Sequence, residues 1–328
     1  MIKAANDSIC PVCGNRENTI LYDKNEEWDT GRFFYRILKC NSCSHLFSFP
    51  SPAFKESDTI YEESRAVFLN DLERTNKKIK RLKSFWRRFV LREYLGYKKA
   101  PSRRILKYLC ALFLSRFTSL NLLPFHKEGR ILDVGCNNGL YLHLLKNLGW
   151  QVWGVEIDRN ACKLAKELNI NIFCGNLEEA GFSESFFDVV RLNQVLEHIP
   201  DPKKTIKEAR RILKKDGKIY ISIPNARSFA FFLFGDAWLS TGHVQGFSPC
   251  SMKCFCGDLG LKIKSMRFSS SKNLLIMGVN YFFKARGKDI SLKNGFILRI
   301  AAAGFSFILN ILHLSDTLTV EAEKRSTR

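Results

Sequence analysis

The stretch 130–223 constrains the fold of this chain more than any other, because apolar strand patterns and helical patterns alternate along it. Its first strand pattern, Arg130–Val134, runs into a glycine-bearing turn and then into the helical stretch Leu140–Leu148. A second strand pattern follows at Gln151–Ile157. Strands and helices that alternate in this way predict an α/β fold with a doubly wound, Rossmann-like parallel sheet.

The turn after the first strand has the composition of a ligand-binding loop. Gly135 and Gly139 allow the backbone to approach a ligand closely, and the N–H groups of the following helix would face an anionic group. Glu156 ends the second strand, where a carboxylate can accept hydrogen bonds from ribose hydroxyls. A dinucleotide fingerprint needs G-x-G-x-x-G, whereas this loop reads Gly135-x-Asn137-x-Gly139. We therefore expect a nucleoside-bearing cofactor but not a dehydrogenase.

The segment Leu132–Gly139 resembles the first motif of the class I S-adenosylmethionine-dependent methyltransferases. Later parts of the chain are similar to further motifs of that family and follow in family order, at 155–158, at 187–190 with 195–202, and at 213–221. Ordered matches of this kind are much stronger than a lone glycine loop. The resemblance implies a seven-stranded methyltransferase sheet with S-adenosylmethionine as the cofactor.

The resemblance also implies which residues bind that cofactor. They are Asp133, Gly135, Cys136, Asn137, Gly139, Glu156, Ile157, Asn176, Leu177 and Asn193. Asp133 and the two glycines would face the methionine end, Glu156 the ribose and Ile157 the adenine. Asn176 corresponds to a position that touches the adenine amino group, and Asn193 ends the fourth strand beside the sulfonium.

Two residues depart from the usual motifs of the family. Asn137 replaces the middle glycine of the loop, and it is tolerated there because asparagine adopts left-handed backbone conformations more readily than most residues. Similar asparagine-containing loops occur in sugar C-methyltransferases that also carry an N-terminal zinc site. Asn176 replaces the usual acid, which puts the adenine contact in doubt but not the identity of the cofactor.

Two Cys-x-x-Cys pairs near the N-terminus predict a metal site. They are separated by a stretch that alternates like a β-hairpin, at Asn18–Tyr22 and Phe33–Leu38. Four thiolates close a tetrahedron around Zn²⁺ and leave no position for water, so we expect a structural zinc; the alternative is four unrelated thiols. The expected ligands are Cys10, Cys13, Cys40 and Cys43. His45 follows closely, but four thiolates need no fifth ligand.

A later group of cysteines does not predict a second metal site. Ser248-Pro249 has the form of a helix start, so Cys250 and Cys254 would lie one turn apart without a second pair, and with Cys256 they are interpreted as packing residues. The first residues, MIKAANDSICPVC, lack the apolar core of a signal peptide. We therefore expect a reducing, cytoplasmic compartment.

The chain carries a formal net charge of +20, much of it concentrated between Lys77 and Arg104. That stretch holds twelve basic residues and one acid, and its apolar residues recur at three- and four-residue steps. A basic amphipathic helix is expected there, within a helical connector at 59–125. Its apolar face could pack on the main domain, or the helix could meet an anionic membrane surface or nucleic acid.

The region 226–250, which follows the fifth strand, is expected to form a lid over the substrate, as it does in related methyltransferases. Within it, His243-x-x-x-Phe247-Ser248 resembles a histidine-bearing segment of the zinc-containing sugar methyltransferases. Because the sulfonium is already a strong electrophile, one histidine that takes the acceptor's proton could suffice. His243 is therefore the candidate catalytic base, and the alternative is a histidine that only anchors the lid. His198, which follows Glu197, is expected to have a positioning role.

Three apolar stretches lie outside the sheet pattern, at 105–123, 229–239 and 296–314. None predicts a membrane span, because the last is interrupted by polar residues and is followed by a strand pattern at 316–322. We interpret 280–314 as a hydrophobic insertion in the methyltransferase domain.

The expected organisation is a zinc-ribbon-like module at 1–58, the connector at 59–125 and the methyltransferase domain at 126–328. The favoured acceptor is a small molecule, a glycan or a lipid-linked intermediate, met by a cytoplasmic protein seated on the inner face of an anionic membrane. An RNA methyltransferase is the alternative, although the aromatic residues of the basic segment occupy its apolar face and form no stacking platform. A non-catalytic binding protein is a third reading, disfavoured by the intact Asp133 and Glu156. Oxygen, nitrogen and carbon acceptors stay open.

Overall fold

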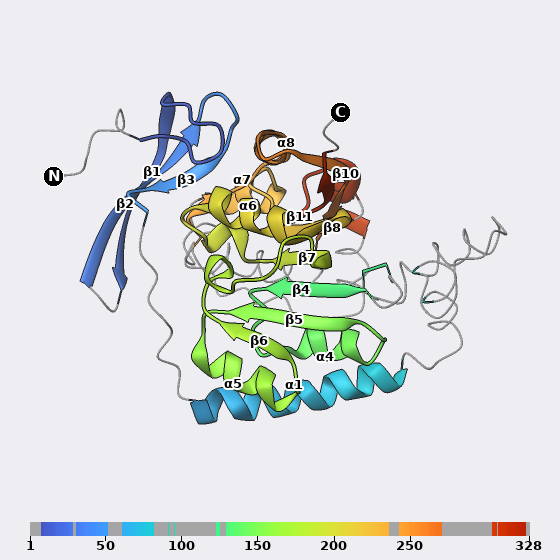
Figure 1. Cartoon of the computed structure of the whole chain (residues 1–328). Helices are drawn as coiled ribbons and strands as arrows, with labels where there is room; N and C mark the ends of the chain where they lie inside the picture. The colour runs from blue at the N-terminus through green and yellow to red at the C-terminus, as the bar shows by residue number, and fades with distance from the viewer. Residues whose placement is uncertain are drawn as a thin grey trace. The chain divides into compact units, whose positions relative to one another are not determined.

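The computed structural model (Figure 1) describes residues 8–28, 31–51, 61–81, 91, 95, 123–124, 129–235, 243–270, 304–306 and 308–325. The chain forms two compact units. The terminal unit consists of Met1–Lys55, Leu192–Arg210 and Lys218–Arg328, and the middle unit consists of Glu56–Arg191 and Arg211–Gly217. The cysteine-rich N-terminus is therefore grouped with the C-terminal part of the chain.

A seven-stranded sheet confirms the α/β fold predicted from the sequence. Its strands are β4 (Arg130–Val134), β5 (Gln151–Glu156), β6 (Asn171–Cys174), β7 (Phe187–Asn193), β8 (Leu213–Pro224), β10 (Leu261–Ser269) and β11 (Thr317–Lys324). They are ordered β10-β11-β8-β7-β4-β5-β6. Strands β4, β5 and β6 run parallel, whereas β11 is antiparallel to both β8 and β10. The order reverses between β4 and β7, which is where ligands bind in open sheets of this kind.

In the middle unit, helices cover the parallel strands. Helix α4 (Leu140–Lys146) follows β4, and α5 (Arg159–Glu167) follows β5. Helix α5 starts where it does because the carboxylate of Asp158 accepts hydrogen bonds from the backbone N–H groups of Asn160 and Ala161. Helix α1 (Tyr61–Arg81) lies across α4 and α5 (Figure 1).

Helix α1 is the described part of the predicted connector. Phe68 is buried, whereas Lys77 and Lys78 at the start of the basic stretch are exposed. Most of the predicted basic helix at 77–104 and most of the apolar stretch at 105–123 lie outside the described residues. The basic amphipathic helix therefore stays a prediction.

In the terminal unit, the cysteine-rich N-terminus forms the predicted hairpin. Strand β1 (Asn18–Trp28) pairs antiparallel with β2 (Gly31–Cys40). Strand β3 (Leu46–Phe49) pairs with β2 and also with β9 (Gln245–Gly246), giving a sheet of order β1-β2-β3-β9. The N-terminal module, which we define as residues 8–51, thus completes its sheet with a strand that lies far along the sequence.

The terminal unit also contains short helices. They are the one-turn helix η3 (Leu196–His198), most of α6 (Pro202–Ile212), α7 (Phe229–Phe234) and α8 (Pro249–Asp258). Helix α8 begins as predicted, because the Ser248 side chain accepts a hydrogen bond from the Ser251 N–H and Pro249 occupies the first helical position. The predicted last strand is confirmed as β11. Within the part of the chain that the structure describes, no helix is long and apolar enough to cross a membrane.

Candidate functional site

The turn after β4 adopts the backbone conformations that its residues were predicted to allow. Gly135, Asn137 and Gly139 all have left-handed φ angles, of 67°, 50° and 73°. A Cβ atom on Gly139 would lie 2.9 Å from the Cβ of Ala165 on α5, so only glycine fits there. The asparagine that departs from the family motif is thus accommodated in the conformation it tolerates best.

Glu156 at the end of β5 holds this turn in place. Its Oε2 accepts the Asn137 N–H at 2.7 Å, and its Oε1 accepts the N–H groups of Ile157 and Asp158 at 2.8 and 3.1 Å. A carboxylate has about four lone-pair positions, so Oε2 retains one for a ligand hydroxyl. Ile157 is 54% exposed and offers an apolar surface beside it. These groups fit the ribose and the adenine of S-adenosylmethionine.

Three predicted cofactor residues contribute less through their side chains than the motif suggests. Cys136 is buried against β5, where a Cβ on Gly154 would lie 2.5 Å from its Sγ. Leu177 in the one-turn helix η2 (Leu177–Glu179) is also buried, which leaves its main chain as the part a ligand could reach. Asn176 is exposed and bonds through its Nδ2 to Glu179 Oε1 at 3.2 Å. Their cofactor contacts stay predictions, as does that of Asn193, which ends β7 half-buried.

The sequence alone did not indicate Arg191, which lies on β7. Its Nη1 bonds to both carboxylate oxygens of Asp133, at 2.7 and 2.9 Å, and its guanidinium lies 4.0 Å from the centre of the Tyr141 ring. Burial raises the pKa of Asp133, and Arg191 opposes that rise. The signal in the sequence was an arginine within an apolar central strand, because a buried charge needs a partner. The contact of Asp133 with the methionine end of the cofactor stays a prediction.

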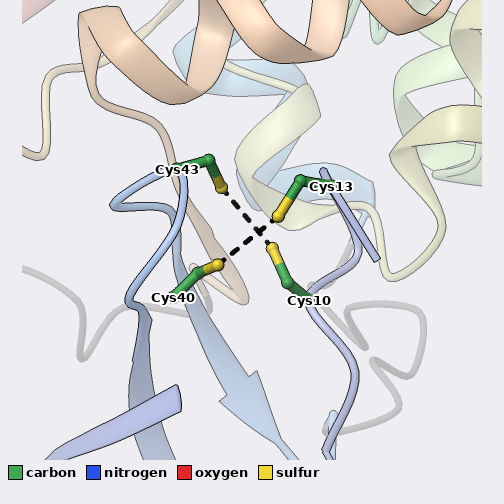
Figure 2. Close-up of side chains that lie close together, drawn as sticks. All are labelled: Cys10, Cys13, Cys40 and Cys43. Carbon is green, nitrogen blue, oxygen red and sulfur yellow. Dashed lines mark hydrogen bonds between the residues drawn. The ribbon is translucent and has the colours of Figure 1, made fainter. Parts of the chain in front are cut away.

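The four predicted zinc ligands converge on one point (Figure 2). The Sγ atoms of Cys10 and Cys43 are 3.7 Å apart, those of Cys13 and Cys40 are 3.4 Å apart, and all four lie within 4.8 Å of one another. A zinc ion with four Zn–S bonds of about 2.3 Å would place its sulfurs about 3.8 Å apart, so the spacing fits.

Each pair of cysteines lies in a tight turn of the same form. The N–H of Gly14 donates to the carbonyl of Cys10, and that of Ser44 donates to the carbonyl of Cys40, both at 2.9 Å. Gly14 and Ser44 both have left-handed φ angles. The two turns therefore present their thiols in the same way, and His45 is not a member of the sulfur cluster.

The electrostatics of the thiols support a cation between them. The hydrogen bond from Cys43 lowers the pKa of Cys10 to about 5, whereas that bond and burial raise the pKa of Cys43. Sulfurs this close need a divalent cation if all of them are to be thiolates. The donor set and its closed geometry fit Zn²⁺ in a structural role.

A second cluster contains the predicted base. His243 lies beside Glu197 and His198, and the potential ligand atoms of the three residues lie within 4.8 Å of one another. The rings of His198 and His243 meet edge to face with their centroids 4.8 Å apart. The Val244 N–H donates to the Glu197 carbonyl at 2.8 Å, which fixes the two segments together. The lid histidine therefore lies beside the segment that follows β7, a proximity that the sequence did not predict.

Glu197 is the most unusual member of this cluster. It is 1% exposed, and within the described residues neither of its carboxylate oxygens has a hydrogen-bond partner. Burial raises its pKa to about 7. A carboxyl group that changes charge near neutrality, beside two imidazoles, can exchange protons, and the three groups could also hold a cation.

Comparisons with known proteins identify a family and several relatives of this chain. The sequence profile of a methyltransferase domain family matches residues 102–265, which is half of the chain. The ubiquinone biosynthesis O-methyltransferase of Coxiella burnetii is 34% identical over 114 residues, covering 33% of this chain and 48% of that protein. The protein of the same name from Idiomarina loihiensis is 33% identical over 141 residues, covering 40% of this chain and 57% of that protein.

The chain spans about half the length of the curated relatives it matches. A solved S-adenosylmethionine-dependent methyltransferase from Archaeoglobus fulgidus overlaps 74% of this chain and 100% of its own, with 18% identity and a TM-score of 0.45. The family profile covers the strands β4 to β8 and the loop that carries Gly135, Gly139 and Glu156. This chain therefore belongs to the class I S-adenosylmethionine-dependent methyltransferase family.

Proposed function

We propose that this chain transfers a methyl group from S-adenosylmethionine to a hydroxyl of a sugar, polysaccharide or lipid-linked acceptor at the surface of an anionic membrane. The observation that carries the chemistry is the cluster of Glu197, His198 and His243. A buried carboxyl group beside two imidazoles is suited to accepting and holding a proton. Two relatives that are named as O-methyltransferases support oxygen as the acceptor atom.

In the proposed reaction, separate groups bind the cofactor and accept the proton. The turn at 135–139 and Glu156 hold the cofactor, which when bound supplies an electrophilic methyl group. His243 takes the hydroxyl proton on an imidazole nitrogen, and the Glu197 carboxylate stabilises the resulting imidazolium once it is ionised. Because burial raises the pKa of Glu197 to about 7, this support increases as the pH rises through neutrality. His198 keeps the His243 ring in place through their edge-to-face contact.

An exposed apolar patch supports the membrane part of the proposal. Helix α7 lies beside the described residues 304–306 and 308–314, because the Phe229 N–H donates to the Leu314 carbonyl at 2.8 Å and the Phe229 ring contacts that of Phe305. Phe232 is 82% exposed and Ile311 is 62% exposed. The other exposed apolar side chains on these segments are Leu233, Phe305, Ile308 and Leu312. Contiguous apolar side chains on a surface mark interaction sites.

The charge of the chain favours an anionic membrane as the partner of this patch. The stretch 271–303, which directly precedes residue 304, includes six basic residues and one acid. The stretch 77–104 includes twelve basic residues and one acid. A chain that combines basic stretches with exposed apolar residues favours anionic lipid surfaces.

The chemistry is tested by labelled methyl transfer from S-adenosylmethionine into fractionated lipid, polysaccharide and RNA from the source cell. Label in the lipid or polysaccharide fraction supports the proposal, whereas label in RNA alone contradicts it. His243→Ala should abolish turnover while cofactor binding, measured by calorimetry, persists. His313→Asn is a matched control, because His313 is exposed and its left-handed backbone suits asparagine. Normal turnover by His243→Ala would remove the assigned base.

The membrane contact is tested by vesicle flotation. We expect binding to vesicles that contain phosphatidylglycerol, weakened at high salt and lost in the double variant Phe232→Ser, Ile311→Ser. Leu69→Ser is the control, because Leu69 is an exposed apolar residue on α1 and not part of the patch. Equal flotation of the double variant and the control variant would overturn the assignment of the patch.

A further inference from the structure

A buried hydrogen-bonded bridge joins the N-terminal module to the segment that carries His243. His45 is completely buried, and its Nε2 lies 2.7 Å from Oε1 of Gln245. The Gln245 Nε2 donates to the Pro200 carbonyl at 3.1 Å. The Pro200 carbonyl can only accept a hydrogen bond, so the amide nitrogen of Gln245 faces it and the amide oxygen of Gln245 faces His45. His45 therefore donates through its Nε2–H. One side chain therefore links the module to the end of the segment that contains Glu197 and His198.

The main chain reinforces this bridge on both sides. On the module side, the Cys40 N–H donates to the His45 carbonyl at 2.9 Å, so a predicted zinc ligand fixes the backbone that carries His45. Strand β3 then pairs with β9, with Phe47 opposite Gln245. Next to the base, the Val244 carbonyl accepts the Ser48 N–H at 3.0 Å, and the Val244 N–H donates to Glu197. The residue that follows His243 is thus bonded to both the module and the Glu197 segment.

The packing around His45 leaves little room for another arrangement. Its ring meets that of Phe247 at a centroid distance of 4.5 Å and stacks on Phe47 at 6.2 Å. Gln245 and Phe247 are nearly fully buried. Within the described residues His45 Nδ1 has no hydrogen-bond partner, so the bond between Nε2 and Gln245 holds the polar side of the ring, and losing it would leave both buried groups unpaired at a cost in stability.

We propose that His45 and Gln245 are positioning residues that align His243 with Glu197, and that this alignment depends on an intact metal site in the N-terminal module. The inference rests on the proposed function, in which His243 takes the proton. It gives the zinc module a role in catalysis that needs no contact with substrate. A displacement of the base by about 1 Å can cost about 10²-fold in rate, so the bridge is expected to act on turnover and not on cofactor affinity.

The test uses substitutions that change the bridge without removing volume. His45→Phe keeps a ring but has no donor, Gln245→Met keeps the length but has no amide, and His45→Gln restores an N–H donor. Ser48→Ala is the matched control, because it removes a buried side chain from β3 but leaves the backbone bond to Val244. Zinc content, S-adenosylmethionine affinity, kcat and KM are measured for each full-length variant.

We expect His45→Phe and Gln245→Met to lower kcat by about 10- to 100-fold with full zinc and unchanged cofactor affinity. His45→Gln should recover most of the loss, and Ser48→Ala should match the unaltered protein. A merely structural role would lower thermal stability without this recovery or this separation of kcat from binding. Normal kcat in Gln245→Met overturns the proposal, even if His45→Phe loses activity together with its zinc.

A second measurement does not depend on activity. Amide hydrogen exchange at Val244 and Ser48 should become at least about tenfold faster in Gln245→Met and after zinc is removed by a chelator, since both amides belong to the bridge. Unchanged exchange in both cases overturns the coupling. If His243→Ala retains turnover, the assigned base is wrong, and the exchange result then decides separately whether the module and the 243–248 segment are coupled.

Discussion

Two buried carboxyl groups in this molecule, Asp133 in the middle unit and Glu197 in the terminal unit, are each 1% exposed but have opposite surroundings. Asp133 is paired with Arg191 through two hydrogen bonds. Glu197 has two imidazoles nearby, and its carboxylate oxygens accept no hydrogen bond from the described residues. The difference separates a carboxylate whose charge is neutralised in place from a carboxyl group free to take up and release a proton.

The comparison extends to the four cysteines, which concentrate more negative charge than either acid once they are thiolates. Their counter-charge is the predicted zinc ion, as that of Asp133 is Arg191. A buried negative group without a counter-charge destabilises the folded protein. Removing a counter-charge should therefore cost more stability when it leaves more negative charges unpaired. Removing the charge of Glu197 should instead stabilise the protein, because Glu197 lacks such a partner among the described residues.

The largest effect is expected from Cys10→Ser. Zinc binding contributes about 10–16 kcal/mol to the folding of small zinc domains, so losing a ligand should release the metal and unfold the N-terminal module. Zinc content by atomic spectroscopy and limited proteolysis within β1 and β2 measure this. Cys250→Ser is the control, because Cys250 is exposed on α8. Full zinc occupancy and a protease-resistant module in Cys10→Ser would contradict the assignment.

Arg191→Met should have the next largest effect, because it leaves Asp133 buried without its partner. Breaking a buried ion pair from one side costs about 3–5 kcal/mol, which urea unfolding can measure. The double variant Arg191→Met, Asp133→Leu should recover most of that loss, since it removes both charges together. A double variant no more stable than the single one would show that the pair is not what stabilises these strands.

Glu197→Gln is expected to stabilise the protein at high pH. The pKa of Glu197 is raised to about 7 from an ordinary value of 4.5, so the folded state keeps a proton that the unfolded state loses in this window. Stability therefore falls as the pH rises from about 4.5 to 7, by up to about 3 kcal/mol, and the glutamine variant escapes this loss. Its advantage should be largest at pH 8 and smallest at pH 5.

Urea unfolding at the two pH values checks this expectation, with Glu184→Gln as a control at an exposed acid. The same difference between variant and unaltered protein at both pH values would contradict a titrating Glu197. The glutamine variant should also lose turnover, because its amide cannot stabilise an imidazolium as a carboxylate does. Higher stability together with lower activity is the pattern expected of a strained catalytic group.

The sequence predicted those parts of the molecule that short segments determine by themselves. The strand, turn and helix around Gly135 and Gly139, the hairpin with its cysteine turns, and the start of α8 at Ser248 all depend on residues close together in the chain. The Asp133–Arg191 pair joins residues 58 positions apart, and the His45–Gln245 bond joins residues 200 positions apart. No local pattern encodes such contacts, because they form only when β7 joins β4 and when β9 joins the module.

Glu197 was predicted only as the neighbour of a positioning histidine, because nothing in a motif reveals how deeply a carboxyl group is buried. Burial raises its pKa to about 7, and in the proposed function its carboxylate supports the His243 imidazolium. The basic stretch at 77–104, which dominates the charge of the chain, lies mostly outside the described residues and stays a prediction.

Glu156 is a third carboxylate that lies between these extremes, since it is half-buried and accepts three backbone N–H groups. Glu156→Gln places an amide NH₂ opposite at least one of these donors, so we expect a loss of about 1–2 kcal/mol in stability. It also removes the oxygen assigned to the ribose, and S-adenosylmethionine affinity by calorimetry should fall by about tenfold, which is about 1.4 kcal/mol. Glu184→Gln is the control, because Glu184 is an exposed acid outside the predicted cofactor site. If both variants bound the cofactor equally well, Glu156 would serve only to hold the turn, and the ribose would have to be recognised elsewhere.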